Sequence, residues 1–226
     1  MEPGWAVVTG ASSGLGVALA AELARRGHHL VLVARREQPM RELAAWLERE
    51  HGIRTAVHAL DLGEPDSAAT LQQRLDAAGI EVDVLVNNAA FAYSGTFLGQ
   101  EPDRLRAMLQ LDVVALTELT HTFGRRMAER GRGHILLVGS VGAYTPSPLA
   151  AAYSAAKAYV LSLGVALRVE LAPRVGVTVL SPGIMETEFP AIAGYAPKSS
   201  MRSSFLPPAR VAAIGVEAMF AGRSFS

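Results

Sequence analysis

The sequence predicts a doubly wound α/β fold, in which helices cover both faces of a parallel sheet, within a single domain over residues 1–226. Apolar strand-like runs alternate with helical patterns along the chain, which favours right-handed strand–helix–strand units. The run His29–Ala34 is apolar at nearly every position, as expected for a strand that is buried on both faces. A glycine-rich turn follows the first strand and leads directly into a helix, which is a frequent start of such a fold.

The first unit consists of the strand Trp5–Thr9, the turn Gly10–Gly16 and the helix Val17–Arg26, which Gly27 is expected to end. The later elements are expected in the same alternation. They are strands at 29–34, 55–60, 83–87, 134–138 and 177–180, and helices at 40–50, 66–78, 102–129 and 149–171. No internal repeat, low-complexity tract or interdomain linker interrupts this order, so one domain is expected.

The composition excludes several classes of protein. With 226 residues, 50% of them hydrophobic, the chain is long enough for a sizeable core. The 21 basic and 21 acidic residues give a net charge of zero, so neither nucleic acid nor an anionic membrane is an expected partner. No apolar run reaches the roughly 20 residues of a membrane span. The absence of cysteine excludes disulfides and thiolate metal sites.

The two ends of the sequence lead to expectations about localisation and about the length of the chain. Met1 is followed within a few residues by a core strand, which leaves no room for a signal peptide and predicts a cytoplasmic protein. At the other end, Ser224–Ser226 coincides with the expected start of a final strand, so we expect a chain that is truncated at its C-terminus.

The turn after the first strand has the chemistry of a phosphate-binding loop. Gly10, Gly14 and Gly16 are expected to give a tight turn, close approach of the backbone to phosphate and close packing of helix on strand. Backbone N–H groups and the positive end of the helix then favour a pyrophosphate here. This turn is also predicted to contact the cofactor through Ser12, Ser13 and Leu15. The two serines add hydroxyl donors.

A proton-transfer pair is predicted on the helix at 149–171. Tyr153 and Lys157 are four residues apart and therefore share one helix face, which brings the ammonium close to the phenol. A free tyrosine ionises at about pH 10, and a neighbouring positive charge favours the phenolate, which suits general acid–base catalysis. Such a pair also arises by chance on exposed helices, so its meaning depends on the other motifs.

Several motifs occur together in a fixed order. They are Thr9–Gly16, Asp61-Leu62, Asn87-Asn88-Ala89-Ala90, Ser140, Tyr153-x-x-x-Lys157, and Pro182-Gly183 with Thr187. In this set, which spans essentially the whole chain, the sequence resembles the short-chain dehydrogenase/reductase family in its compact single-domain branch. The resemblance implies a Rossmann-like fold and an oxidoreductase that transfers a hydride between a nicotinamide and a carbonyl or alcohol.

The resemblance also implies a role for each motif residue. Tyr153 would act as general acid or base, Ser140 would hydrogen-bond the substrate oxygen, and Lys157 would support Tyr153 and hold the nicotinamide ribose. Further cofactor contacts are implied at the ends of the third, fourth and sixth strands: Asp61, Leu62, Asn88, Ala89, Ala90, Pro182, Gly183 and Thr187. Ala90 departs from the glycine that is usual in the family and narrows the space beside the ribose. Asp61 has an alternative interpretation as a helix N-cap or loop aspartate.

A second position that departs from the family pattern lies in the long helix before the fifth strand. The family often has an asparagine there, whose backbone helps to hold a water in a proton relay, whereas by spacing this chain has Asp112. If only the main-chain carbonyl matters, aspartate can substitute. If the side-chain amide matters, a carboxylate alters the relay and can pair with Lys157. A local capping or pairing role for Asp112 is the alternative.

The end of the second strand favours NADP(H) over NAD(H). An acidic residue there would bind the ribose hydroxyls of NAD, whereas arginine accommodates the additional phosphate of NADP. Here the strand runs into Arg35 and Arg36 with no acid before Glu37, and guanidinium groups are good planar partners for phosphate. The alternative is that both arginines are solvated residues that open a helix.

An apolar substrate pocket is expected from two segments. The substrate loop near 185–208 carries Phe189, Tyr195, Met201 and Phe205. The opposite wall would be formed by Phe91, Tyr93, Tyr144, Pro146 and Pro148. A pocket with few charges favours a neutral, hydrophobic carbonyl or alcohol as the small-molecule substrate. The alternative is that these residues are core or oligomer contacts.

No metal site is predicted, because the six histidines lack metal-ligand spacing. The adjacent His28 and His29 are interpreted as a solvated turn.

The resemblance implies that the helices Leu105–Met127 and Leu149–Leu171 pack against a second copy, and the second helix is apolar on nearly all sides, so a homodimer or homotetramer is expected. The alternative is that other loops of the same chain cover this face. A non-catalytic dinucleotide-binding sensor or scaffold of the same fold is the alternative function. The joint presence of Ser140, Tyr153 and Lys157 favours the enzyme, because a binding module needs no positioned acid.

Overall fold

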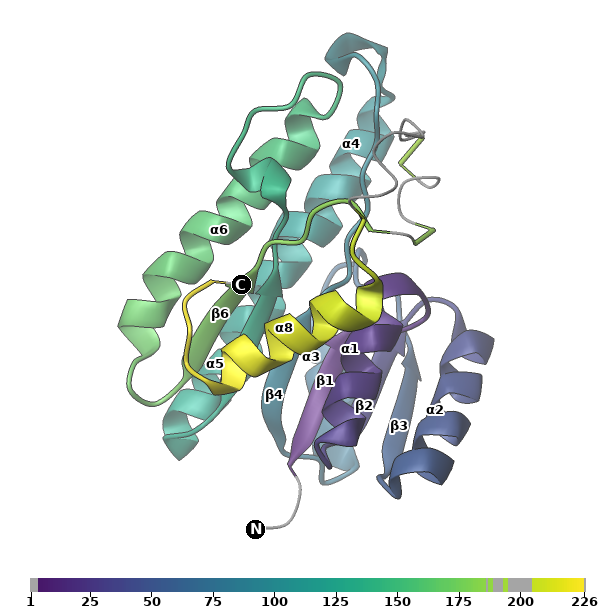
Figure 1. Ribbon diagram of the computed structural model, residues 1–226, viewed down its shortest axis with the longest axis vertical. Coiled ribbons are helices and arrows are strands. Elements are labelled where there is room, and N and C mark those ends of the chain that lie inside the picture. Colours follow the sequence, from purple (N-terminus) through teal and green to yellow (C-terminus); the bar gives the residue numbers. More distant parts are fainter. Residues whose placement is uncertain (1–3, 186, 189–192, 195–204, 226) are drawn as a thin grey trace.

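The computed structural model describes residues 4–185, 187–188, 193–194 and 205–225. Its centre is a parallel sheet of six strands in the order β3-β2-β1-β4-β5-β6 (Figure 1). The strands are β1 Trp5–Thr9, β2 His29–Ala34, β3 Thr55–Ala59, β4 Val82–Asn87, β5 His134–Val138 and β6 Gly176–Leu180. The helices are α1 Gly14–Arg25, α2 Glu37–His51, α3 Ser67–Ala77, α4 Pro102–Leu109, α5 Leu116–Arg130, α6 Ala151–Leu171 and α8 Pro208–Phe220. The predicted doubly wound α/β fold is therefore confirmed.

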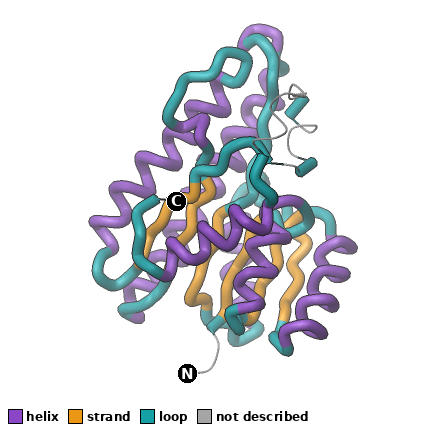
Figure 2. Tube along the Cα trace, in the orientation of Figure 1, coloured by secondary structure: helices purple, strands orange, loops and turns teal. Residues whose placement is uncertain are grey.

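Helices cover both faces of the sheet, and each face has its own hydrophobic core. Successive residues of a strand point to opposite faces, so Val8 of β1 belongs to the core formed with α1, α2 and α8, whereas Val7 belongs to the core formed with α3, α5 and α6. The two layers are visible on either side of the strands (Figure 2). Because both faces are buried, strands such as β2 are apolar at nearly every position, as their sequence predicts.

The order of the strands reverses between β1 and β4, which lie side by side in the middle of the sheet. The chain runs outward from β1 to β3 on one side and outward from β4 to β6 on the other. In open parallel sheets the crevice at such a switch point, beyond the carboxyl ends of the strands, is where ligands bind. A ligand site is therefore expected at the loops that follow β1, β4, β5 and β6.

The helix expected over 102–129 is present but is not α-helical throughout. A π-helical segment, Gln110–Ala115, joins α4 to α5 without a break in the chain's helical course. The wider hydrogen-bond pattern of a π segment holds one more residue per turn than an α-helix and occurs frequently at functional sites. Asp112 is in this segment and is fully buried.

Two differences from the sequence prediction concern histidines and the end of the chain. The interpretation of His28 and His29 as a solvated turn is wrong: His29 is the first residue of β2 and is 9% exposed. His28 stacks on Phe220 of α8, with ring centroids 5.3 Å apart. Helix α8 is not among the predicted elements. The expected final strand is represented by one bridge, in which Phe225 pairs with Val179 of β6.

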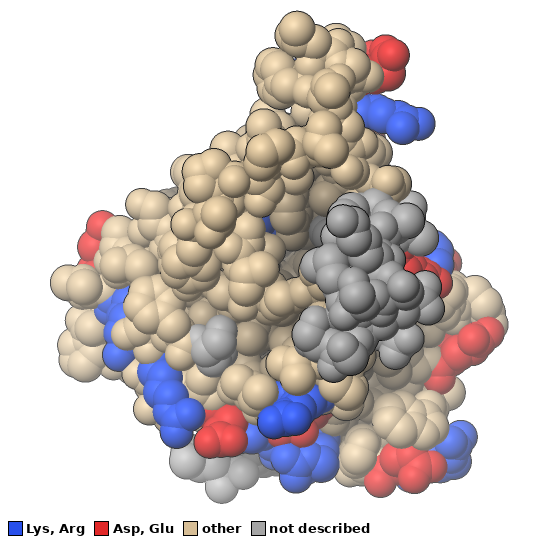
Figure 3. Space-filling view, turned by 45° about the horizontal axis from the view of Figure 1, so that its top comes forward, with Lys and Arg blue, Asp and Glu red and all other residues tan. Residues whose placement is uncertain are grey.

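The surface shows charges of both signs interspersed around the lower rim in Figure 3, whereas the upper part of that view is mostly uncharged. Among the helices that the structure describes, none combines the length and the apolar character that a membrane span requires.

Candidate active site

A cavity of about 650 Å³ opens beyond the carboxyl ends of the strands, at the switch point of the sheet. Most of the residues that the sequence predicts for the site line it. From the first half of the chain these are Gly10, Ser12, Ser13, Gly14, Leu15, Gly16, Arg35, Arg36, Asp61, Leu62, Asn88, Ala89 and Ala90. From the second half they are Ser140, Tyr153, Lys157, Pro182, Gly183 and Thr187. Of the site residues that the sequence predicts, only Asp112 does not line the cavity, and its carboxylate lies next to the Lys157 ammonium.

The glycine-rich turn is closely packed against the end of β4. Gly10 has a φ of +68°, and a Cβ at Gly16 would overlap the carbonyl oxygen of Gly10. Only glycine at these two positions permits the turn and the start of α1 to lie so close together. Asn88 fastens the turn from the other side, because its side-chain Nδ2 donates to the carbonyl of Thr9 at 2.8 Å.

Thr9, a residue of the motif that was not assigned to the site, has a clear supporting role. Its buried Oγ1 accepts from the backbone N–H groups of Asn88 and Ala89, both at 2.9 Å. These bonds hold the end of β4 next to the phosphate-binding turn. The hydroxyl is in the sequence motif, but only the strand order shows that β1 and β4 are neighbours.

Lys157 is the most deeply buried charged residue that lines the cavity. It is 2% exposed, and its ammonium donates to the carbonyl of Val138 at 3.2 Å. It also lies 5.6 Å from the centre of the Tyr153 ring, one helical turn away on α6. The predicted proximity of ammonium and phenol is therefore present in the structure.

Asp112 forms a buried ion pair with Lys157. The carboxylate Oδ2 lies 3.5 Å from the ammonium, and Oδ1 accepts from the backbone N–H of Phe91 at 3.1 Å. Burial raises the pKa of the Asp112 carboxyl above its usual range, while the Lys157 charge and the Phe91 N–H oppose part of that rise. The side chain of Asp112 thus pairs with Lys157, as one of the sequence-based interpretations expects.

Two serine hydroxyls lie near Tyr153. The Oγ of Ser140 accepts from the backbone N–H of Gly142 at 3.1 Å and keeps its own hydrogen for another acceptor. A Cβ at Gly142 would lie 3.4 Å from the Ser140 Oγ and 3.6 Å from the Ser154 Oγ, so the two hydroxyls are near one another. Ser154 was not predicted from the sequence. Its buried Oγ has no hydrogen-bond partner among the described residues and lines the cavity.

The two arginines after β2 each approach an acidic side chain at the cavity wall. Arg35 Nη1 lies 3.8 Å from Asp61 Oδ2, and Arg36 Nη2 lies 3.2 Å from Glu188 Oε2. The other oxygen of Asp61 accepts from the backbone N–H of Gly63 at 2.9 Å, so this aspartate also has the loop-stabilising contact of its alternative interpretation. Glu188, which directly follows Thr187, was missed from the sequence.

The expected substrate walls are only partly present. Phe91, Tyr93 and Pro148 line the cavity, whereas Tyr144, Pro146 and Phe205 are not among its lining residues. Instead, the hydroxyls of Tyr144 and Ser181 lie 3.3 Å apart. Phe189, Tyr195 and Met201 of the expected substrate loop lie outside the described residues. Other apolar residues that line the same cavity are Ala92, Leu149, Ile184, Met185 and Ala193.

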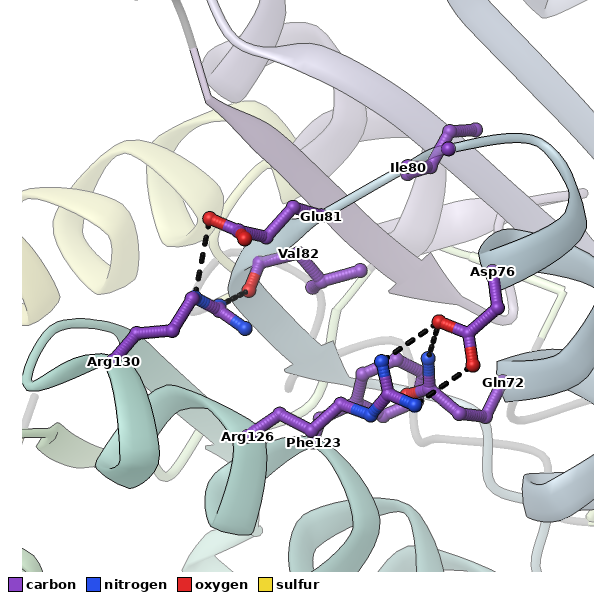
Figure 4. Close-up of a pocket in the computed structure, with 9 residues that line it drawn as sticks. Gln72, Asp76, Ile80, Glu81, Val82, Phe123, Arg126 and Arg130 are labelled. Atoms are coloured by element: carbon purple, nitrogen blue, oxygen red, sulfur yellow. Dashed lines mark hydrogen bonds and ion pairs between the residues drawn. The ribbon is translucent and has the colours of Figure 1, made fainter.

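A smaller cavity of about 250 Å³ lies between α3, the start of β4 and α5, away from the carboxyl ends of the strands (Figure 4). Its charged groups have partners: Arg126 forms two contacts of 2.7 Å with Asp76, and Arg130 lies 3.2 Å from Glu81. These contacts join α5 to the neighbouring elements, so a structural role accounts for them. Among the described residues, no group of three or more potential ligand side chains is placed to hold a metal ion.

Comparison with known proteins gives a consistent set of relatives. A family model described as short chain dehydrogenase matches residues 4–193. A very-long-chain 3-oxoacyl-CoA reductase of Laccaria bicolor is 36% identical over 169 residues, which are 74% of this chain and 50% of the relative. A probable oxidoreductase of Mycobacterium tuberculosis, EphD, is 32% identical over 190 residues, 83% of this chain and 32% of the relative. The chain thus spans half or less of the length of these two curated relatives.

Solved structures resemble the chain over nearly its whole length. A short-chain dehydrogenase from Sphingobium yanoikuyae in complex with NADPH has a TM-score of 0.91 and 31% identity, covering 99% of this chain and 86% of that one. A bulky-bulky ketone specific alcohol dehydrogenase from Comamonas testosteroni has a TM-score of 0.87 and 29% identity, covering 100% of this chain and 86% of that one.

Proposed function

This chain belongs to the short-chain dehydrogenase/reductase family, and from that premise we propose that it is an NADP(H)-dependent oxidoreductase acting on a carbonyl or alcohol. The observation that carries the proposal is the position of Ser140, Tyr153 and Lys157 on one cavity with the predicted dinucleotide contacts. A hydroxyl donor, a phenol and a buried ammonium beside a dinucleotide crevice are suited to proton transfer at a carbonyl oxygen.

The residues of the cavity fit a dinucleotide. The start of α1 presents backbone N–H groups at a turn where the glycines leave no side chain in the way, which suits a pyrophosphate. Ser13, the N-cap residue, makes no side-chain capping bond, so its hydroxyl is available to a ligand. At the other end of the cavity, the Oγ of Ser154 is a buried polar atom that a bound molecule can satisfy.

The bound nicotinamide would supply or accept the hydride. In the direction of reduction, Tyr153 donates its proton to the carbonyl oxygen as negative charge develops there. Ser140 donates a hydrogen bond to the same oxygen, so the charge is stabilised in a largely apolar setting. Lys157 holds a positive charge next to the phenol, and Asp112 positions that charge through the contact of 3.5 Å. In oxidation each of these proton movements is reversed.

The preference for NADP(H) is proposed from Arg35 and Arg36. Both guanidiniums line the cavity at the end of β2, where the phosphate on the adenosine ribose would lie. The nicotinamide side would be held by Lys157, by the backbone at Pro182-Gly183 and by Thr187. The NADPH bound to the enzyme from Sphingobium yanoikuyae supports this choice.

The substrate is proposed to be neutral and hydrophobic. The cavity that contains Tyr153 has many apolar lining residues, with Phe91, Leu149, Ile184 and Met185 among them. The segment near 185–208 is proposed as the substrate loop. The names of the relatives agree with such a class, since they include a very-long-chain 3-oxoacyl-CoA reductase and a bulky-bulky ketone specific alcohol dehydrogenase.

The test is a screen of NADPH oxidation against aldehydes, ketones and quinones, followed by absorbance, with NADH as the comparison. We expect turnover with at least one hydrophobic carbonyl. Tight NADPH binding without turnover of any member of the panel, or of the matching alcohols with NADP, would favour the non-catalytic sensor or scaffold instead.

The cofactor preference has its own test. Arg35→Asp should weaken NADPH binding by about ten- to a hundredfold, because it removes a charge-assisted phosphate contact of about 1.5–3 kcal/mol. NADH binding should be unchanged or improved. Calorimetry that finds the wild-type protein indifferent to the 2′-phosphate would contradict the proposed preference.

A further inference from the structure

One guanidinium connects three separate segments at the cavity wall. Arg36 Nη2 lies 3.2 Å from the carboxylate of Glu188 and 3.3 Å from the carbonyl oxygen of Ser12. Its Nε lies 3.4 Å from the hydroxyl of Ser12. Arg36 follows β2, Ser12 is in the glycine-rich turn and Glu188 follows β6. The ion pair therefore joins, at the cavity wall, two residues that are 152 positions apart in the sequence.

Glu188 places a negative charge where the proposed cofactor carries several. The preceding residue packs on the phosphate-binding turn, because a Cβ at Gly14 would lie 3.4 Å from the Thr187 side chain. Glu188 itself lines the cavity, and its side chain is 58% exposed, so the carboxylate is accessible from the solvent-filled space. A phosphate group at this wall would meet both the guanidinium of Arg36 and its existing carboxylate partner.

We propose that Glu188 is a specificity-determining residue, which competes with the 2′-phosphate of NADP(H) for Arg36 and thereby limits the preference for NADP(H) over NAD(H). The inference rests on the proposed function. NAD(H) has a hydroxyl in place of this phosphate and leaves the ion pair intact. The competition therefore acts on one cofactor and not on the other.

The size of the effect follows from the exposure of the pair. Separating an exposed ion pair costs about 0.2–1 kcal/mol, which corresponds to about a 1.5- to 5-fold change in affinity. A phosphate monoester carries a charge of about −1.5 to −2 at pH 7, so repulsion from the carboxylate adds to this cost. Asp61 is a weaker competitor at Arg35, because their distance is 3.8 Å and one of its oxygens already accepts from Gly63.

The experiment compares two nucleotides that differ only in the phosphate of interest, adenosine 2′,5′-bisphosphate and adenosine 5′-monophosphate. Calorimetry with Glu188→Gln should show about two- to fivefold tighter binding of the bisphosphate and unchanged binding of the monophosphate. The matched control is Glu217→Gln, since Glu217 is 64% exposed and pairs with Arg223 at 3.7 Å outside the cavity. The control should change neither affinity.

A second comparison uses Arg36→Gln as the background. The gain from Glu188→Gln should be smaller there, because the carboxylate then has no guanidinium to withhold and only its repulsion of the phosphate remains. Unchanged or weaker bisphosphate binding in Glu188→Gln would overturn the inference while leaving the proposed function in place. If the wild-type protein bound neither nucleotide nor NADPH, the proposed function itself would fail and the inference with it.

Discussion

Lys157 is buried at the candidate site and is contacted on several sides. An ammonium that is 2% exposed is costly to bury unless it is paired and hydrogen-bonded. Here the Val138 carbonyl accepts from it, the Asp112 carboxylate lies 3.5 Å away, and the Tyr153 ring lies on its third side. These contacts fix the position of a positive charge next to the phenol.

The first prediction at this scale concerns the proton donor. Tyr153→Phe should lower turnover by about 10²- to 10⁴-fold, the usual contribution of general acid–base catalysis. Its affinity for NADPH should remain nearly unchanged, because the ring keeps its packing. Steady-state kinetics and calorimetry measure the two effects separately. Tyr159→Phe is the control, because its hydroxyl contacts Thr117 at 2.9 Å and it does not line the cavity. Near wild-type turnover of Tyr153→Phe would show that another group supplies the proton.

The second prediction concerns the carboxylate that faces Lys157. Because burial raises the Asp112 pKa, this group loses its proton at a higher pH than an ordinary aspartate. Once ionised it partly cancels the Lys157 charge and disfavours the phenolate form of Tyr153. Asp112→Asn removes that negative charge and should favour the phenolate. Reduction needs the protonated phenol, so its decline at alkaline pH should begin at a lower pH in the variant.

The measurement is the pH dependence of kcat/KM for reduction, in the wild-type protein and in Asp112→Asn. A merely structural role of Asp112 would scale the whole profile without moving it. Superimposable profiles would mean that the carboxylate has no electrostatic influence on the proton donor.

At the level of single residues, the sequence motifs identify the groups that converge on the cavity but not all of their contacts. Ser140, Tyr153 and Lys157 are recognisable because their spacing is local. Glu188 and Ser154 are not, since the contact of Glu188 with Arg36 spans 152 positions and the isolation of the Ser154 hydroxyl depends on packing. The proposed roles of all these residues stay predictions until they are tested.

At the scale of elements, helix α6 sits unusually close to β6. Gly164 is buried, and a Cβ there would overlap the Val179 side chain of β6 and lie 3.2 Å from Leu137 of β5. The absence of a side chain at this position lets the helix that carries Tyr153 and Lys157 approach the sheet. The distance between α6 and the sheet at Val179 thus depends on the absence of a side chain at Gly164.

Gly164→Ala should therefore destabilise the protein by about 1–2 kcal/mol. Overpacking of a core costs about 1–3 kcal/mol, and the better helix propensity of alanine offsets up to about 1 kcal/mol of this cost. Gly124→Ala in α5 is the matched control, because its Cβ would meet Ile135 at an ordinary 3.4 Å. It should be neutral or slightly stabilising. Chemical denaturation measures both, and equal stability of the two variants would argue against the close approach of α6 to β6.

The strands and most helices could be predicted because their signals are local: apolar runs, glycine turns and amphipathic spacing. Helix α8 is missed although Pro207-Pro208 precedes apolar residues at helical spacing, which is a start signal. The burial of His28 depends on that helix, since its ring stacks on Phe220. The sequence has no comparable local signal for the π segment, because the hydrogen-bond pattern of that segment depends on the packing around it.

At the scale of the whole molecule, several exposed apolar side chains lie on two adjacent helices. Exposed apolar side chains occur on α6 and on the neighbouring helical course from α4 to α5. They are Leu109, Val114, Tyr159, Val165 and Val169, the last of which is 77% exposed. The hydroxyl contact between Tyr159 and Thr117 shows that the two helices are adjacent. Exposed apolar side chains that are grouped on adjacent helices indicate a surface for protein–protein contact.

We therefore predict a homodimer or homotetramer with two-fold symmetry. Light scattering at micromolar concentration should report two or four copies of the 23.9 kDa chain. Val169→Glu should shift the distribution toward the single chain, whereas Trp46→Glu on α2, which packs at the other edge of the sheet, should not. A particle of one chain at every concentration tested would contradict the prediction.

The π segment Gln110–Ala115 has a consequence for changes in chain length. It fixes the rotation of α4 relative to α5, so that Met108 and Asp112 face inward together with Leu116. A π segment accommodates one additional residue within an α-helix, so deleting one residue here would restore an ordinary α-helical repeat without rotating the flanking helices. Met108 and Leu116 would keep their inward positions, whereas the residue that faces Lys157 would change. Homologous helices that differ in length here would therefore place different side chains behind the lysine, even where the aligned residues are identical.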